Sequence, residues 1–231
     1  MKPLQSWTWF KIHIPPEERK KTRNLMKVGG VECISPAFKP EHWCLNPICL
    51  ITGDGDTLPA DVQEFKSWGV PHDTYCVNRS IAFMDTPVNH WTAVDVEESM
   101  WLSENMRPEH IPPSGKIVRH TIGVMKGGYD CFWVAKCSFE NEWSKRLWVG
   151  NSGYFAVLTA IAMGYQKIVL AGMPLNKNRH WYDSPDTEGP QWVPECYTTW
   201  MDFAIENPDA HKVRSMSGYT AFILGCSNGT P

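Results

Sequence analysis

From residue 48 onward, short apolar runs alternate with longer stretches in which apolar residues recur at helical spacing. The runs predict short buried strands at 48–52, 73–78, 90–95, 116–121, 131–135, 167–171 and 211–216. The stretches between them predict helices at 58–68, from 96 onward, at 152–163, at 195–205 and at 217–224. Strands that alternate with helices favour parallel pairing, because a parallel crossover needs a long connection. The pattern therefore predicts an α/β, Rossmann-like three-layer fold with a mostly parallel sheet and helices on both faces.

The first 47 residues follow a different pattern. Residues 7–14 alternate apolar and polar side chains and predict a strand, and the polar stretch 16–27 predicts a helix. A Gly-Gly pair at 29–30 and a proline-punctuated connection over 35–47 come next. This segment can add an edge strand to the main sheet, at an edge that the sequence does not specify. We expect an N-terminal extension, 1–47, packed on a main domain, 48–231.

Two glycine-bearing turns lie where a predicted strand meets a predicted helix. Asn151-Ser152-Gly153 opens the helix 152–163, and the turn after the strand 48–52 consists of Gly53, Asp54, Gly55, Asp56 and Thr57. Glycine lets a ligand approach the backbone closely, and a helix N-terminus offers N–H groups to an anion. We expect both turns to surround a phosphorylated ligand. Turn geometry alone also explains the glycines, and a simple helix cap also explains Ser152.

Three further polar residues follow neighbouring predicted strands. Asn78 and Arg79 end the strand 73–78, and Asp95 ends the strand 90–95. In a parallel sheet both ends emerge at the edge that holds the glycine turns. An amide there can bond a ribose or a base, arginine can take a phosphate, and a carboxylate can hold a hydroxyl or a metal. Helix capping explains the same residues, but together they predict that 48–231 is a Rossmann-like nucleotide-binding domain.

A long loop over 174–194 follows the strand 167–171 and is rich in Pro, Asp, Asn and aromatic residues. Long loops in compact domains often form lids or binding sites. His180 is the candidate catalytic base, because imidazole titrates near neutrality, and Asp183 is the second candidate. A solvated loop without function explains the same composition.

Charge and cysteine content narrow the choice of partners. A net charge of -3 and a pI near 6.2 argue against nucleic acid, which needs clustered Lys and Arg. The eight cysteines never form a C-x-x-C pair, which speaks against a metal site and for a reducing compartment. The first ten residues lack the apolar core of a signal peptide, and no stretch approaches the ~20 apolar residues of a membrane span. We expect a cytoplasmic protein without a membrane span and leave a homo-oligomer open.

Three segments occur in a recognisable order: Leu50 to Leu58, Val77 to Ile81, and Asn151 to Gly172. They resemble the superfamily that joins bacterial lipooligosaccharide sialyltransferases, motility-associated flagellin glycosyltransferases and archaeal hydroxymethylpterin pyrophosphokinase-like proteins. The resemblance covers parts of 48–175 and is most specific in the Ser-Gly helix that leads through Gly-Tyr into an apolar strand. It implies that the turns and Asn78 surround a nucleotide. It also makes Tyr182 the nearest counterpart of a tyrosine that meets the phosphate in the sialyltransferases.

The chain departs from this family in two places. The family's Gly-Asn-Gly-Pro-Ser-Leu is Gly-Asp-Gly-Asp-Thr-Leu here, which puts Asp54 and Asp56 where an anionic ligand should approach. Like charges in a poorly solvated site repel strongly, so either a cofactor such as Mg²⁺ assists or the ligand differs. The catalytic histidine of the sialyltransferases has no clear counterpart, and His180 matches it by position alone.

The sequence therefore predicts a transferase with a nucleotide-activated donor, and more narrowly a sialyltransferase-like glycosyltransferase. Its partner would be a nucleotide or nucleotide-sugar small molecule. One alternative is a pyrophosphokinase-like enzyme in which Asp54, Asp56 and Asp95 hold Mg²⁺ between phosphates. The other is a non-catalytic ligand-binding or assembly module on the same fold, which the altered glycine turn makes credible.

Overall fold

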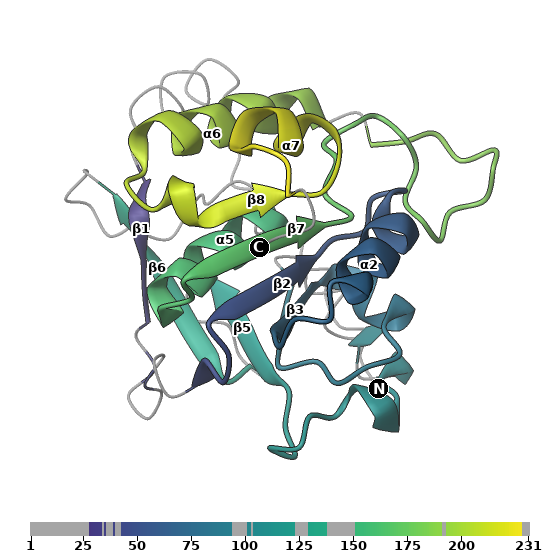
Figure 1. Cartoon of the computed structure of the whole chain (residues 1–231), viewed down its shortest axis with the longest axis vertical. Coiled ribbons are helices and arrows are strands. Elements are labelled where there is room, and N and C mark those ends of the chain that lie inside the picture. The colour runs from purple at the N-terminus through teal and green to yellow at the C-terminus, as the bar shows by residue number, and fades with distance from the viewer. Residues whose placement is uncertain are drawn as a thin grey trace, which may run out of the picture.

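An eight-stranded sheet forms the centre of the computed structural model, which describes residues 28–33, 35, 39, 43–93, 101–102, 104–122, 129–137, 151–190 and 193–227. The strand order is β1-β6-β5-β4-β3-β2-β7-β8 (Figure 1). All neighbouring strands are parallel except β1 and β6. The strands are β1 Val28–Cys33, β2 Ile48–Thr52, β3 Asp73–Val77, β4 His90–Thr92, β5 Val118–Ile122, β6 Cys131–Cys137, β7 Lys167–Ala171 and β8 Val213–Ser215.

Helices cover both faces of this sheet. They are α2 Leu58–Ser67, α5 Ser152–Met163, α6 Val193–Glu206 and α7 Gly218–Leu224, with short 3-10 turns at Asn78–Phe83, Pro108–His110 and Ala210–Lys212. Successive side chains of a strand point to opposite faces. Cys49 and Ile51 pack in one apolar cluster with α5 and α6, whereas Leu50 packs in another with α2. The predicted three-layer α/β fold is confirmed. Within the described residues, no helix combines the length and apolar character needed to cross a bilayer.

The predicted elements that fall within the described residues are present, with some shifted ends, whereas the start of the predicted helix from 96 lies outside these residues. α5 and β7 agree with their predicted ranges residue for residue. Asn151 begins α5 by accepting a hydrogen bond at Oδ1 from Tyr154 N (2.8 Å), and Gly164, with a φ of +98°, ends it. β3 stops at Val77, one residue early, because Asn78 has a φ of +51° and begins a 3-10 turn instead of extending the strand.

The N-terminal segment adds the edge strand β1, which pairs antiparallel with β6. β1 runs through the glycine pair 29–30. The register shifts between Val28 and Val31, and Gly30 has a φ of +119°, so the pair forms an irregularity inside the strand. The predicted strand 7–14, the predicted helix 16–27 and Asp95 lie outside the described residues.

The chain runs outward from β2 in both directions. It passes through α2 to β3 and on to β4, β5 and β6, and then returns through α5 to β7 on the other side of β2. The order of the strands therefore reverses between β2 and β7. In open α/β sheets a ligand binds outside the carboxyl ends of the strands at such a switch point.

A chain of hydrogen bonds crosses the interior between β3 and β6. Trp133 Nε1 donates to His120 Nδ1 (3.0 Å), and His120 Nε2 lies 3.0 Å from His90 Nδ1. His90 Nε2 lies 3.0 Å from Tyr165 OH, which donates to Asp73 Oδ2 (2.8 Å). An indole N–H can only donate and a carboxylate can only accept, which sets the direction of every bond. Both imidazoles are therefore neutral and carry their proton on Nε2.

Burial keeps both histidines neutral. It lowers the pKa of His90 to about 4, against a smaller opposite effect of the Asp73 charge. Burial also lowers the pKa of His120 well below its ordinary value, and the neighbouring His90 lowers it further. Asp73 accepts additional hydrogen bonds from Leu45 N (2.7 Å) and Asn46 Nδ2 (2.7 Å), so this buried carboxylate is well satisfied.

We predict that the free energy of unfolding falls as the pH drops from about 6.5 to about 4. The unfolded chain protonates His90 near pH 6.5, whereas the folded chain does so only near pH 4. The stabilisation that depends on neutral His90 is complete above about pH 6.5 and is lost between about pH 6.5 and about pH 4. The loss from His90 is about 3 kcal/mol, at about 1.4 kcal/mol per pKa unit, and His120 adds to it.

Urea unfolding at a series of pH values between 7.5 and 4 measures this dependence. His211 is exposed, so His211→Gln should keep the wild-type dependence. An unfolding free energy that stays constant between pH 7 and 5 would contradict the neutral histidine pair.

Candidate functional site

Main-chain hydrogen bonds join the segments that follow β2 and β7. Gly53 N donates to Ala171 O (2.9 Å), and Gly55 N donates to Gly172 O (2.8 Å). A Cβ atom on Gly53 would lie 2.8 Å from Gly172 O, and one on Gly55 would lie 2.4 Å from Pro174 Cδ, so only glycine permits this approach. The N–H groups of both glycines are used within the protein. This differs from the expectation that they are offered to a phosphate.

The two glycine turns predicted from the sequence meet at Met173. A Cβ atom on Gly53 would lie 2.6 Å from Met173 Cγ, and one on Gly153 would lie 3.0 Å from Met173 Sδ. Met173 is 8% exposed, so its side chain occupies the space between the turns. Ser152 is buried beside it, and Asn151, not Ser152, caps the helix. The structure thus brings the turns together and places a methionine side chain between them.

A buried carboxylate that the sequence pattern does not single out holds this edge together. Asp61, in the first turn of α2, accepts hydrogen bonds at Oδ2 from Gly172 N (2.8 Å) and Ser217 Oγ (2.7 Å). Thr57 Oγ1 donates to the same oxygen (3.0 Å) and lies 2.8 Å from Ser217 Oγ. Thr57, a predicted nucleotide ligand, therefore has its hydroxyl in an internal network. An acid in a first helical turn is common, which hides this role in the sequence.

Asp56 anchors the loop that follows β7. Its Oδ1 accepts a hydrogen bond from Asn176 Nδ2 (3.0 Å), and its Oδ2 accepts one from Asn178 Nδ2 (2.7 Å). Leu175, in the same loop, has a φ of +48°, a backbone conformation that is costly for leucine and needs such support. The carboxylate that the sequence places in the path of an anion is thus engaged by neutral amides.

Arg79 lies between two aromatic rings at this edge. Its guanidinium carbon is 5.4 Å from the Trp101 ring centroid and 5.3 Å from that of Tyr182. Its main-chain N donates to Asp54 Oδ2 (3.3 Å), and Asp54 O accepts from Trp181 N (3.1 Å). Cation–π contacts fix the plane of the guanidinium, whose edge carries the donors that bind phosphates. The structure brings Asp54, Arg79 and Tyr182 into one cluster.

His180 reaches the same cluster from the long loop, which Figure 1 shows extending beyond the sheet beside α2. It forms an antiparallel bridge with Gly55, and its ring stacks on Tyr182 with centroids 5.2 Å apart. His180 Nδ1 lies 3.0 Å from Asp183 Oδ2, which also accepts from His180 N (2.8 Å). A carboxylate can only accept, so Nδ1 carries the proton. The lone pair of the neutral imidazole is then on Nε2, as a general base requires.

Asn78 combines two unusual features. Its φ of +51° lies in the left-handed region, where asparagine is one of the few tolerated side chains. Its Oδ1 is buried and accepts no hydrogen bond within the described residues, while its main-chain O accepts one from Trp91 Nε1 (2.8 Å). Buried acceptors in proteins are usually hydrogen-bonded, so the donor for this oxygen must be a group that is not among the described residues. By contrast, neighbouring Ser80 has a structural role, since its Oγ donates to Thr52 O (2.9 Å) at the end of β2.

The carboxylates of this edge that the structure describes do not form a metal cluster. In the part of the chain that the structure describes, no three His, Cys, Asp or Glu side chains come together as ligands for an ion. Asp95, the third member of the predicted Mg²⁺ set, lies outside that part, as do all of 94–100, 123–128 and 138–150. The described site is therefore built by the segments after β2, β3 and β7 and by the start of α5.

A scan against models of protein families and a search of curated proteins both find no match for this chain. Among solved structures, the chain is similar to the MAf glycosyltransferase from Magnetospirillum magneticum AMB-1, with a TM-score of 0.48 and 10% sequence identity. The similarity covers 85% of this chain and 35% of that chain, so this chain spans about a third of the length of the protein it matches.

Proposed function

We propose that the protein is a transferase that binds a nucleotide-activated donor at the carboxyl edge between β2 and β7, and that it is a glycosyltransferase. The observation that carries this proposal is the hydrogen-bonded pair of His180 and Asp183, which the bridge with Gly55 holds at the turn after β2. A base positioned at the switch point of a parallel sheet lies where such folds bind ligands. The order of the three sequence segments described above supports the same class.

In this proposal His180 deprotonates the acceptor hydroxyl. Nε2 takes the proton, the hydroxyl oxygen attacks the anomeric carbon of the donor, and the bond from that carbon to the phosphate oxygen breaks. The nucleotide leaves with the electron pair. Asp183 accepts the Nδ1–H bond, which orients the ring and stabilises the imidazolium that forms.

Arg79 and Asn78 would hold the nucleotide. The guanidinium held between Trp101 and Tyr182 can neutralise the negative charge that grows on the departing phosphate. The buried Oδ1 of Asn78 can accept a hydrogen bond from a ribose hydroxyl or a base amino group. Ser152 and Gly153 form the N-terminus of α5 at the same edge of the sheet. A helix N-terminus favours the binding of an anion.

The two alternative functions would need different contacts at this edge of the sheet. A pyrophosphokinase-like enzyme needs Asp54, Asp56 and Asp95 as ligands of Mg²⁺, and the ion would have to displace two asparagine amides from Asp56. A non-catalytic module is favoured by one observation, the side chain of Met173 between the glycine turns. In the proposed function Met173 moves aside or forms part of the wall of the site.

We predict that a nucleoside phosphate raises the melting temperature. A ligand that binds only the folded state stabilises it by about 2.7 kcal/mol at about a hundred times its Kd, or roughly 5 to 10 °C for a chain of this size. Thermal shifts with CMP, UDP, GDP and ATP, each with and without Mg²⁺, measure the effect. A response to CMP matches a sialyltransferase-like donor. A response to ATP with Mg²⁺ alone, or no response, overturns the proposal in favour of the pyrophosphokinase or the module.

Arg79→Met tests where the nucleotide binds. It keeps the aliphatic stem between the two rings and removes the charge, so the thermal shift should disappear. Lys66→Met is the matched control, because Lys66, on α2, forms a surface ion pair with Asp85, and this variant should keep the shift. A full shift in Arg79→Met would place the nucleotide elsewhere.

His180→Gln tests the base. We predict that it slows hydrolysis of the sugar nucleotide whose nucleotide raises the melting temperature, with water in place of the acceptor hydroxyl, by about 10²- to 10⁴-fold, because glutamine cannot take a proton. The thermal shift should persist, since His180 acts on the acceptor. Chromatography of the released nucleotide measures the rate, and the exposed His211→Gln serves as the control. Equal rates for His180→Gln and wild type would exclude His180 as the base.

A further inference from the structure

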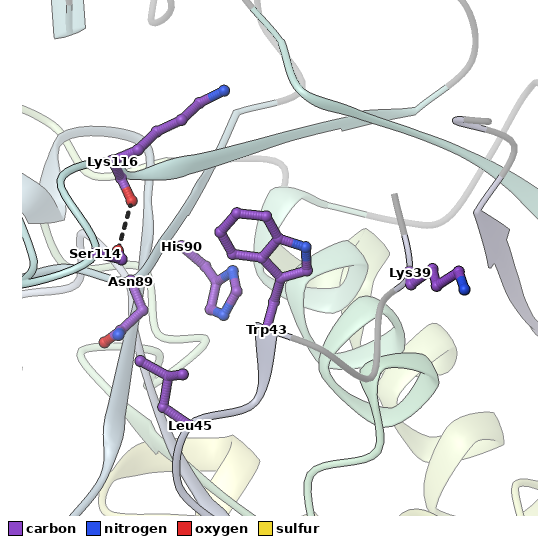
Figure 2. Close-up of a pocket in the computed structure, with 7 residues that line it drawn as sticks. All are labelled: Lys39, Trp43, Leu45, Asn89, His90, Ser114 and Lys116. Carbon is purple, nitrogen blue, oxygen red and sulfur yellow. Dashed lines mark hydrogen bonds between the residues drawn. The ribbon is translucent and has the colours of Figure 1, made fainter. Parts of the chain in front are cut away.

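A cavity of about 490 Å³ lies at the edge of the sheet opposite the proposed transferase site. His90 is the first residue of β4, Lys116 precedes β5 and Leu45 precedes β2, so these lining residues mark the amino ends of parallel strands (Figure 2). The volume falls within the roughly 300 to 1,000 Å³ of small-molecule sites. None of the candidate residues predicted from the sequence lines this cavity.

The walls combine apolar surface with cations. The half-buried Trp43 ring and Leu45, which is 62% exposed, form the apolar part. Figure 2 shows Lys39 and Lys116 on opposite sides of Trp43. Lys116 forms an ion pair with Asp130, which lines an adjoining smaller cavity. Among the described residues, those that line the larger cavity include no carboxylate, although the chain has a net charge of -3.

The polar groups at the base of the cavity are fixed by the protein. Asn89 Oδ1 accepts a hydrogen bond from Thr74 N (2.9 Å), so the amide offers a ligand only its NH₂ group. Both nitrogens of His90 are engaged, by His120 and by Tyr165, so the imidazole offers its ring surface and not a lone pair. The wall therefore presents donors and rings to a ligand, which complements an acceptor-rich, planar molecule.

We propose that this amino-edge cavity is a second ligand site, which binds a small planar ring that carries a carboxylate or a phosphate. The ring packs against Trp43 and Leu45, and the anionic group lies toward Lys39, Lys116 and the NH₂ group of Asn89. The two anionic groups share the chemistry that the lysines recognise, and the test separates them. This site is independent of the proposed transferase site, because the two lie at opposite edges of the sheet.

Binding of four probes to the full chain tests the proposal: 1-naphthyl phosphate, 1-naphthoate, the uncharged 1-naphthalenemethanol and inorganic phosphate. Ligand-observed NMR titrations give each Kd. We expect one of the two naphthyl anions to bind at least tenfold more tightly than both the alcohol and inorganic phosphate, and the tighter one identifies the anionic group. Equal binding of inorganic phosphate would show an adventitious ion only and overturn the proposal, as would the absence of binding by both naphthyl anions.

Three variants locate the binding. Trp43→Ala removes the aromatic wall, and Leu45→Glu places a carboxylate on an exposed part of the same wall, so each should weaken the naphthyl anion at least tenfold. Leu45→Glu keeps the test decisive if Trp43→Ala fails to fold. Lys39→Met should weaken the anion and reduce the effect of added salt. Unchanged affinity in Leu45→Glu and Lys39→Met would overturn the site.

Arg79→Met separates this site from the transferase site. It should leave the affinity for the naphthyl anion unchanged, and Leu45→Glu should leave the nucleotide thermal shift unchanged. Loss of naphthyl binding in Arg79→Met would show that the probe binds at the carboxyl edge, and it would overturn the second site without touching the transferase proposal.

Discussion

The hydrogen bonds between the turn after β2 and the segment after β7 are the constraint on which the candidate site depends. Gly53 and Gly55 let two backbones approach within distances that no Cβ atom would allow. The segment after β7 then lies along the turn after β2, and the bridge between Gly55 and His180 places His180 at the switch point of the sheet. A side chain at either glycine would push that segment away and carry His180 with it. The glycines therefore serve the site by positioning a loop.

Two acidic residues at this edge also position loops. Asp61 and Asp56 lie at the edge where we propose that the nucleotide binds. Each of them holds loops in place, Asp61 through hydrogen bonds with hydroxyl and main-chain N–H groups and Asp56 through two asparagine amides. Bound in this way, their charge is partly compensated by donors. Asp56, one of the two aspartates of the turn after β2, thus has a structural role in holding the loop after β7.

The elements that the sequence predicts best are those determined by local pattern. α5 has small and apolar residues with a cap at Asn151 and a glycine stop, and β7 is an apolar run, so both ends of each are visible in the sequence. The role of Asp61 was not predictable, because Gly172 and Ser217, which contact it, lie more than a hundred residues away. The same is true of the hydrogen bonds through His90 and His120 and of the amino-edge cavity, whose walls come largely from segments that precede different strands. Sequence pattern reports periodicity, whereas these features depend on which strands become neighbours.

The proposed function requires that a nucleotide binds at the carboxyl edge between β2 and β7. A crystal structure of the protein soaked with CMP, UDP or GDP, whichever binds most tightly, tests it most directly. We expect density for a phosphate within hydrogen-bonding distance of the Arg79 guanidinium, and a donor from the ribose or base at Asn78 Oδ1. The Met173 side chain should be either displaced or in contact with the nucleotide. A nucleotide bound in the cavity beside Trp43, or an edge left unchanged at saturating nucleotide, would contradict the claim.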